Sequence, residues 1–149
     1  RPARPGLQAG RMGWYHRALD VERMREASSL LVGTHDFSAF RSAECQANSP
    51  VRELRRFDIE RHADLIVFRL AANAFLQRMV RNLVGTLIYV GNGKFSPAWV
   101  GQLLEGRNRS CAAPTFAPDG LYLSGVEYDS RWGLPARTAV PLEMLTGMR

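Results

Sequence analysis

An apolar helix pattern over residues 75–91 constrains this chain more than any other feature. Apolar side chains recur there at four-residue steps in two rows, which are Phe75, Met79, Leu83, Leu87 and Leu76, Val80, Val84, Ile88. On a helix of about 3.6 residues per turn the rows merge into one broad stripe, which predicts a helix packed into a core. Arg81 lies well away from the centre of that stripe. It is either a solvated arginine on a polar face or a charge that a rigid helix aims at a ligand.

Length and apolar content suit one compact domain. The chain has 149 residues, 46% of them hydrophobic, and no apolar run approaches the roughly 18 residues typical of a membrane span. The N-terminal sequence RPARPGLQAGR has no signal-peptide core and no initiating methionine, so we interpret it as the cut end of a longer protein or part of a linker. We expect an extended segment or linker over 1–17, a domain over 18–135 and a tail over 136–149.

Cysteine and histidine usage argues against a metal site. Cys45 and Cys111 lie far apart, and His16, His35 and His62 are scattered along the chain. Metal ligands normally show some short spacing, which is missing here. The expectation is therefore a reduced cytosolic protein without a bound metal.

The chain is strongly basic, and its positive charge comes almost wholly from arginine. The net charge is +6, the pI is about 10.1, and Lys94 is the single lysine among 20 basic residues. The planar guanidinium suits phosphate and carboxylate, and a basic domain favours a polyanionic partner. A GC-rich genome also replaces lysine with arginine, so charge alone leaves both explanations open.

The first structured part of the chain is predicted to be an amphipathic helix. Asp20 has the character of an N-cap, apolar residues follow at helical spacing, and Gly33 is the expected C-terminal stop. Residues 34–40 predict a compact turn, in which Asp36 caps a short helical turn and Phe37 packs in the core.

The next part predicts two antiparallel strands. Residues 51–61 alternate, except that Leu54 breaks the phase and suggests a β-bulge. Residues 62–64 form the hairpin turn. Residues 65–70 are apolar on both faces except for Arg69 and predict a central strand.

The part that follows the 75–91 helix predicts one more helix and one more strand. Ser96 is expected to cap a helix that has Pro97 in its first turn and ends at Gly106. Residues 107–120 form a long loop that closes in a Pro-Asp-Gly turn, and residues 121–128 alternate as a third strand.

This order of elements predicts an α+β domain with an antiparallel or mixed sheet that helices cover on one face. The uncovered face of the sheet would be the natural place for a ligand. No motif in the chain assigns chemistry by itself, because phosphate loops, dinucleotide fingerprints, nucleophile elbows and zinc pairs are missing. GNGK (91–94) lacks the spacing of a phosphate loop and is better explained as a helix stop.

Three motifs in combination resemble one family. The sequence contains GTHDFSAF, FLQRMVRNLVG and APTFAPDGLYL in this order. They resemble the C-terminal half of the bacterial tRNA pseudouridine synthase A (TruA) family, over about residues 17–135. The resemblance implies a pseudouridine synthase-like half fold and, in the full-length parent, an isomerase that converts uridine to pseudouridine in the anticodon stem-loop of tRNA. It also implies a reaction without cofactor or metal and a homodimer that binds tRNA across both subunits.

The same resemblance implies what this chain contributes and what it lacks. The nucleophilic aspartate of the family lies in a G-R-T-D motif that the chain does not contain, and the active-site tyrosine is expected upstream of residue 1. We therefore expect the missing N-terminal half to carry the nucleophile and this chain alone to be inactive. Arg81 matches the arginine that pairs with that aspartate, and a guanidinium keeps such a carboxylate ionised and oriented. Leu121 matches an apolar residue that packs against the target base, or else is an ordinary strand residue.

Further arginines are candidates for contact with tRNA. Arg78 and Gln77 stand where the family often has histidine or an aromatic residue, and Arg52, Arg55 and Arg56 could contact phosphate. Strand residues alternate faces, so these three cannot all point one way. Two alternatives remain open, a non-catalytic basic RNA-binding module and a protein–protein interaction domain whose charge reflects genome composition.

Overall fold

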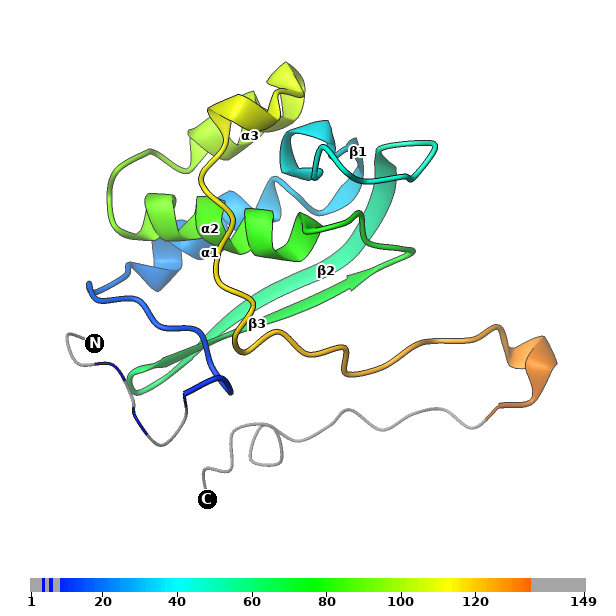
Figure 1. The fold of residues 1–149 in the computed structure, drawn as a ribbon, viewed down its shortest axis with the longest axis horizontal. Helices are drawn as coiled ribbons and strands as arrows, with labels where there is room; N and C mark the ends of the chain where they lie inside the picture. The colour runs from blue at the N-terminus through cyan, green and yellow to red at the C-terminus, as the bar shows by residue number, and fades with distance from the viewer. Residues whose placement is uncertain (1–3, 5, 7–8, 135–149) are drawn as a thin grey trace. The chain divides into compact units, whose positions relative to one another are not determined.

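The computed structural model describes residues 4, 6 and 9–134, which fall into two units. The larger unit is residues 17–116, and the smaller one combines the described parts of 1–16 and of the segment from residue 117 onward. The larger unit contains an antiparallel sheet with helices on one face, so the predicted α+β class is confirmed (Figure 1). None of the helices in the described residues has the length and apolar character that a membrane crossing requires.

The sheet of the larger unit has three antiparallel strands in the order β1-β2-β3. Strand β1 is Gly33–Asp36, β2 is Val51–His62 and β3 is Leu65–Ala72. The predicted hairpin between β2 and β3 is confirmed, with Ala63 in the turn at a φ of 53°. Strand β3 lies at an edge of the described sheet, so its prediction as a central strand was wrong. Apolar residues on both faces of a strand indicate how its faces are packed. They do not indicate how many strands lie beside it.

The predicted β-bulge in β2 is present. The pairing of β2 with β3 shifts register between Leu54 and Arg56. One extra residue reverses the face to which later side chains point, so Leu54 lies on the same buried face as Phe57 and Ile59. Val51, which was predicted to share that face, is 44% exposed instead.

Three helices complete the larger unit. Helix α1 is Val21–Ser29, α2 is Met79–Gly91 and α3 is Ala98–Gly106. The predicted cap of α1 is confirmed, because the carboxylate of Asp20 accepts a hydrogen bond from the Arg23 amide at 3.1 Å. Helix α1 ends before Gly33, which begins β1 instead. Ser96 makes no side-chain cap, and Pro97 directly precedes α3 with helical dihedral angles.

Helix α2 is shorter than the apolar pattern predicted. It begins at Met79 rather than at Phe75, which is 39% exposed. The residue before the helix, Arg78, has a left-handed φ of 62°, and such a residue interrupts a right-handed helix. The hydrophobic pattern continues across this break because Leu76 is still buried.

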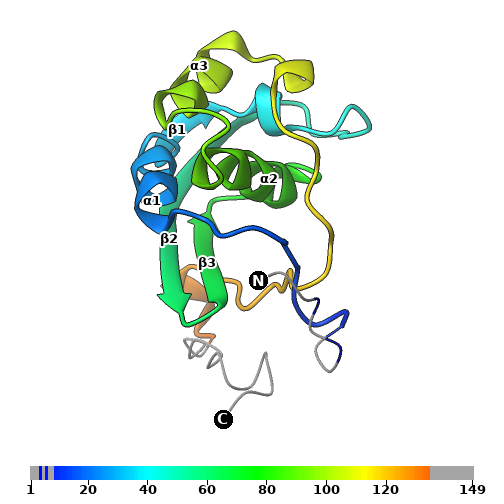
Figure 2. The ribbon, with the colours of Figure 1, turned by 90° about the vertical axis from the view of Figure 1, so that its left-hand side faces the viewer.

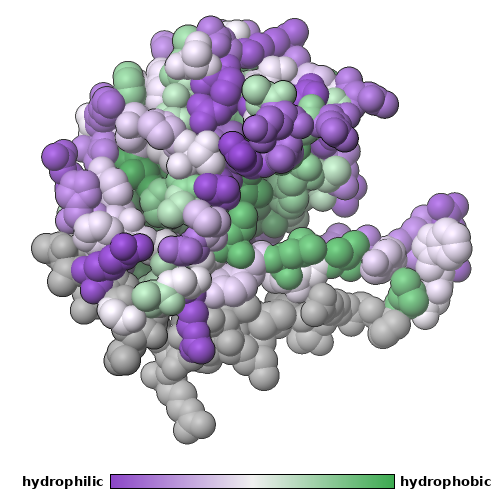
Figure 3. Space-filling model, viewed as in Figure 1, coloured by the Kyte–Doolittle hydropathy of each residue, from purple (hydrophilic) through white to green (hydrophobic). Residues whose placement is uncertain are grey.

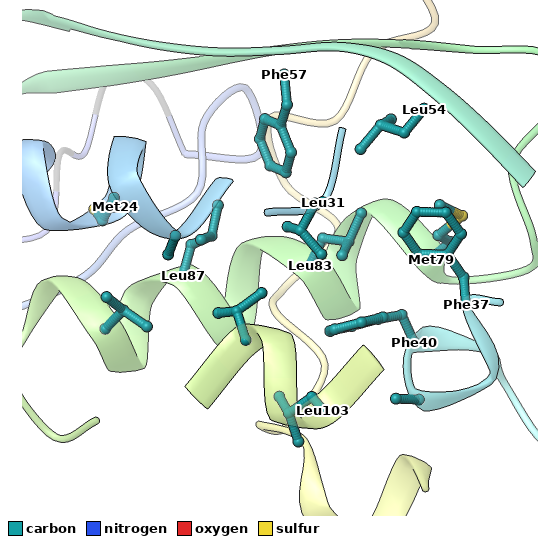
Figure 4. Packing of buried hydrophobic residues seen from close by; sticks show 14 of the residues in the cluster. Met24, Leu31, Phe37, Phe40, Leu54, Phe57, Met79, Leu83, Leu87 and Leu103 are labelled. Atoms are coloured by element: carbon teal, nitrogen blue, oxygen red, sulfur yellow. The ribbon is translucent and has the colours of Figure 1, made fainter. Parts of the chain in front are cut away.

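The core lies between the sheet and the helices. Figure 2 shows the helices and strands that carry the core from a second side. Met24 and Leu31 of the α1 region pack in one cluster with Phe57 of β2 and with Leu83 and Leu87 of α2 (Figure 4). All of these side chains except Phe57 are fully buried. Since both helices share this cluster with the same face of β2, they cover one face of the sheet. The opposite face carries charged side chains, including Glu60, Arg69 and His62.

Two further predictions along the chain were wrong. Gly33–Asp36 is a strand, although residues 34–36 were predicted to be part of a turn. Residues 121–128 were predicted to be a strand but have no strand structure. Alternating side chains make a segment suitable for a sheet, but a strand also needs a hydrogen-bonded neighbour, which 121–128 does not have among the described residues. Apolar residues along that segment are exposed, with Leu123 at 78% (Figure 3).

The turn after β1 depends on Asp36. As predicted, its carboxylate accepts a hydrogen bond from the backbone amide of Ser38 at 2.9 Å. This bond stabilises the short 3-10 turn Ser38–Phe40. Burial raises the pKa of Asp36, but hydrogen bonds from Ser38 and the charges of Arg107 and Arg41 outweigh burial and lower that pKa overall. Phe37, which follows, is fully buried as predicted.

Replacing Asp36 by asparagine should lower the free energy of unfolding at neutral pH. The amide can still accept from Ser38 but loses the ion pair with Arg107, whose Nε lies 3.5 Å from the carboxylate. We expect a loss of about 0.5–1 kcal/mol. Because the folded-state pKa is lowered, this stabilisation is present above the ordinary aspartate pKa of about 3.9 and disappears as the pH falls through the folded value. Urea unfolding of both proteins from pH 2 to pH 7 measures the difference.

Asp64→Asn serves as the control, because Asp64 is an exposed residue of the β2–β3 turn. It should change the free energy of unfolding at pH 7 by less than about 0.5 kcal/mol, as is usual for an exposed residue. An Asp36→Asn curve that runs parallel to the wild type down to pH 2 would show that the carboxylate charge contributes nothing.

Candidate functional site

The candidate site is built on the side of α2 that faces away from the sheet. Its central feature is the segment of residues 113–116, which we call the crossing segment because it runs across α2 (Figure 1). The backbone amide of Phe116 donates to the carbonyl oxygen of Arg81 at 3.2 Å. A helix residue in the first turn and a loop residue far along the chain are thus joined through their main chains.

Gly85 allows the crossing segment to lie directly on the helix. A Cβ atom built at Gly85 would stand 2.3 Å from the carbonyl oxygen of Pro114. This distance is far below van der Waals contact, so no other residue fits there without moving the backbone. The glycine of the MVRNLVG motif therefore has a steric role, which is to admit the crossing segment.

Arg81 is half-buried at the first turn of α2. Its Nε donates to the carbonyl oxygen of Phe116 at 2.7 Å. Within the described residues no ion pair or further hydrogen bond engages its two terminal nitrogens, and neither is a buried atom without a partner. The guanidinium is therefore held at one nitrogen and has its outer edge available. That edge is the part that forms a bidentate pair with a carboxylate.

Asn82 lies beside Arg81 and is buried, with 1% exposure. Its Nδ2 donates to the carbonyl oxygen of Phe40 at 2.8 Å, and its Oδ1 accepts from Arg109 Nη2 at 3.1 Å and from the Thr115 hydroxyl at 2.6 Å. Phe40 lies in the 3-10 turn Ser38–Phe40, Arg109 begins the 3-10 turn Arg109–Cys111, and Thr115 lies in the crossing segment. The single amide therefore joins these three segments to one turn of α2.

A shallow groove of about 410 Å³ lies next to this junction within the larger unit. Its lining includes the polar and charged side chains of Ser42, Glu44, Arg78, Asn82 and Arg109, together with Ala43, Ala112 and Pro114. Arg78 Nη2 lies 3.4 Å from the Glu44 carboxylate, and both side chains are largely exposed. Such a pair exchanges readily with solvent and with anions, so Arg78 is available to a ligand.

The four residues that the sequence singled out lie on different parts of the chain. Arg78 directly precedes α2 and lines the groove, whereas Arg81 lies in the first turn of α2 and is not a lining residue. Arg52 lies in β2, where its Nη1 donates to the carbonyl oxygens of Ser49 and Val51 at 3.0 and 2.6 Å. Leu121 belongs to the smaller unit and is 51% exposed.

Cys45 follows the groove-lining Glu44 and carries a perturbed thiol. Hydrogen bonds from the backbone of Ala47 and Gln77 lower its pKa, helped by Arg41 and opposed by burial. The described residues contain no group of three or more histidine, cysteine, aspartate or glutamate side chains that could hold a metal ion.

Comparison with known proteins places this arrangement in a family. The family model described as tRNA pseudouridine synthase matches residues 27–129, which include all of the site on α2 and the crossing segment. The chain belongs to the tRNA pseudouridine synthase family. The resemblance of the three sequence motifs to this family is thus confirmed.

Individual relatives agree with the family model. The chain is 56% identical over 146 residues to tRNA pseudouridine synthase A of Nitrosomonas europaea, covering 97% of this chain and 54% of the relative. The corresponding protein of Janthinobacterium is 58% identical over 90% of this chain and 49% of its own length. That of Chromobacterium violaceum is 57% identical over 91% and 52%. The chain therefore spans about half the length of the curated relatives it matches.

Sequence reasoning missed Asn82, Arg109 and Thr115. One signal was present, because Asn82 is a polar residue within the strongly apolar helix, and a buried polar side chain needs partners. Its partners could not be found in the same way, since Arg109 and Thr115 lie in the long loop and carry no pattern of their own.

Replacing Gly85 by alanine should destabilise the larger unit, although alanine is the better helix former. The added methyl group would meet the Pro114 carbonyl oxygen, and overpacking of this kind costs about 1–3 kcal/mol. Gly101→Ala in α3 is the matched control, because its Cβ would meet only Leu30 Cδ1 at 3.8 Å. That variant should be stabilised by about 0.5–1 kcal/mol. Urea denaturation measures both, and equal effects of the two changes would mean that the crossing segment does not press on α2.

Proposed function

We propose that this chain is the C-terminal half of the catalytic region of a tRNA pseudouridine synthase that converts uridine to pseudouridine in the anticodon stem-loop of tRNA. Membership of the family and the coverage of about half of each relative support this proposal. The aspartate nucleophile belongs to the part of the parent that this sequence does not contain, since G-R-T-D is absent from residues 1–149. The fragment alone is then inactive.

The observation that carries the proposal is the guanidinium of Arg81. Its Nε is held by Phe116 while its terminal nitrogens have no partner among the described residues. A carboxylate that met this edge would be kept ionised by the charge and oriented by two parallel hydrogen bonds. A nucleophile needs both properties, because attack on the sugar or base requires a charged oxygen at a defined position. Arg81 is therefore the partner of the nucleophilic aspartate.

The other predicted residues have supporting roles in this proposal. Arg78 contacts a tRNA phosphate from the groove, where its exposed pair with Glu44 is easily exchanged. Arg52 adds positive charge to the protein surface that binds the same polyanion. Leu121 packs against the target base, for which its exposed side chain is available. Turning the base over requires that it leave its stack, and an apolar contact favours that state.

The wider assembly follows from the same proposal. The synthase acts in the cytosol as a homodimer, binds tRNA across both subunits, and carries out the isomerisation with no cofactor or metal. The net charge of +6 supports binding to a polyanion. The same charge would also suit a non-catalytic RNA-binding module, in which Arg81 would have no role beyond its charge.

Arg81→Lys in the full-length synthase distinguishes the two functions. Lysine keeps the positive charge but loses the planar fork that orients a carboxylate. We expect kcat to fall on the order of 100-fold, the cost of misplacing a reacting group by about 1 Å, while the Kd for tRNA stays within about twofold. Single-turnover pseudouridine formation and filter binding measure the two quantities.

Arg25→Lys is the matched control for this variant. Arg25 lies on α1, and its Nε also donates to a backbone carbonyl, that of Ile59, at 2.8 Å. It should keep both rate and affinity. An unchanged rate in Arg81→Lys would remove Arg81 from the catalytic machinery and leave the RNA-binding module as the better explanation.

The isolated chain of residues 1–149 should form no pseudouridine in unmodified tRNA. The physical reason is that no residue in it takes the place of the nucleophile. The measurement is mass spectrometry of nuclease-digested tRNA after incubation, with the full-length synthase as the positive control. Pseudouridine above the level of a no-protein blank would show that a nucleophile lies within this sequence.

A further inference from the structure

The buried side-chain amide of Asn82 joins helix α2 to three residues that lie far from it in the sequence, Phe40, Arg109 and Thr115. It has both a donor and an acceptor side, and each has partners that permit only one orientation. The Phe40 carbonyl can only accept, so Nδ2 must point to it, and Arg109 can only donate, so Oδ1 must point to that side. The amide therefore has one orientation, and burial makes the loss of any of these bonds costly.

The Oδ1 atom of Asn82 helps to fix the position of the crossing segment. The Thr115 hydroxyl donates to Asn82 Oδ1 at 2.6 Å and accepts from Arg109 Nη2 at 3.1 Å. Arg109 Nη1 donates to the Ala113 carbonyl at 2.9 Å. With Pro114 resting on Gly85, every residue from 113 to 115 has a contact that fixes its position over α2.

The crossing segment in turn determines where the Arg81 side chain lies. Phe116 comes directly after Thr115, and its carbonyl oxygen is the acceptor for Arg81 Nε at 2.7 Å. A shift of Thr115 would move that acceptor, and the long arginine side chain would lose the one hydrogen bond that the described residues give it. Arg81 and Asn82 are neighbours on α2, so the helix and the loop hold the guanidinium from two directions.

We propose that Asn82 and Thr115 are positioning residues for Arg81, acting through the crossing segment. They do not touch substrate; they hold the Phe116 carbonyl where it orients the guanidinium. The catalytic consequence rests on the proposed function of Arg81, whereas the effect on the orientation of Arg81 does not. The two parts are therefore tested by separate measurements.

Thr115→Val tests the orientation directly, because it removes the hydroxyl and keeps the shape. In the ¹⁵N-labelled chain, the Arg81 Nε–H resonance is assigned by its disappearance in Arg81→Lys. Its hydrogen exchange should be slow in the wild type and at least about tenfold faster in Thr115→Val, because the bond to Phe116 no longer protects it. Thr115→Ser retains the hydroxyl and should restore slow exchange.

Thr86→Val is the matched control. Thr86 is buried one turn further along α2, and its hydroxyl donates to the Asn82 carbonyl oxygen rather than to the side chain. The same substitution there removes a buried hydrogen bond without touching the crossing segment. It should leave exchange at Arg81 Nε unchanged even where it lowers stability. Unchanged exchange in Thr115→Val, or equal acceleration in Thr86→Val, would overturn the proposal.

The catalytic part is measured in the full-length synthase. Thr115→Val should lower kcat about tenfold with KM for tRNA unchanged, and Thr115→Ser should recover the rate. Faster exchange at Arg81 together with a normal kcat would uphold the positioning role and refute the proposed function of Arg81. Unchanged exchange together with a lowered kcat would refute the positioning role and leave the function of Arg81 intact.

Discussion

The contact between the crossing segment and α2 is the constraint on which the site depends. A backbone carbonyl lies against the helix at Gly85, where any side chain would collide with it. The side-chain amide of Asn82, one turn earlier on α2, fixes the position of the crossing segment because it binds Thr115 and Arg109. Helix α2 thus packs on both sides, with a sheet-facing apolar stripe and a polar face that a loop covers.

This arrangement explains how a flexible side chain acquires a defined position. An exposed arginine samples many rotamers, and ordering it costs conformational entropy. At Arg81 the helix backbone fixes one end of the side chain and the Phe116 carbonyl fixes Nε, while the outer edge has no partner in the part of the chain that the structure describes. The core side of the same helix, with Leu83 and Leu87 fully buried, keeps the backbone itself in place. The packed core thereby helps to fix the position of a charged group at the surface.

Prediction from the sequence succeeded where local patterns carry the information. The α+β class, the cap at Asp20, the β2–β3 hairpin and the bulge near Leu54 could all be inferred from spacing and residue type. Strand β1 was missed and residues 121–128 were wrongly predicted as a strand, because strand formation depends on a partner elsewhere in the chain. The start of α2 was also wrong, because a left-handed Arg78 leaves the hydrophobic pattern intact.

The sequence by itself determined the family, the apolar stripe of α2 and the position of Arg81 outside that stripe. The family follows from the resemblance of three motifs, and the other two follow from the spacing of apolar residues. None of them needs knowledge of distant contacts. Only the tertiary structure decided that Asn82 is buried, that Gly85 admits a carbonyl, and that Phe116 holds the guanidinium of Arg81. The physical reason is that each of these depends on a segment about 30 residues away, as in the separation of 35 between Arg81 and Phe116, which only folding brings together.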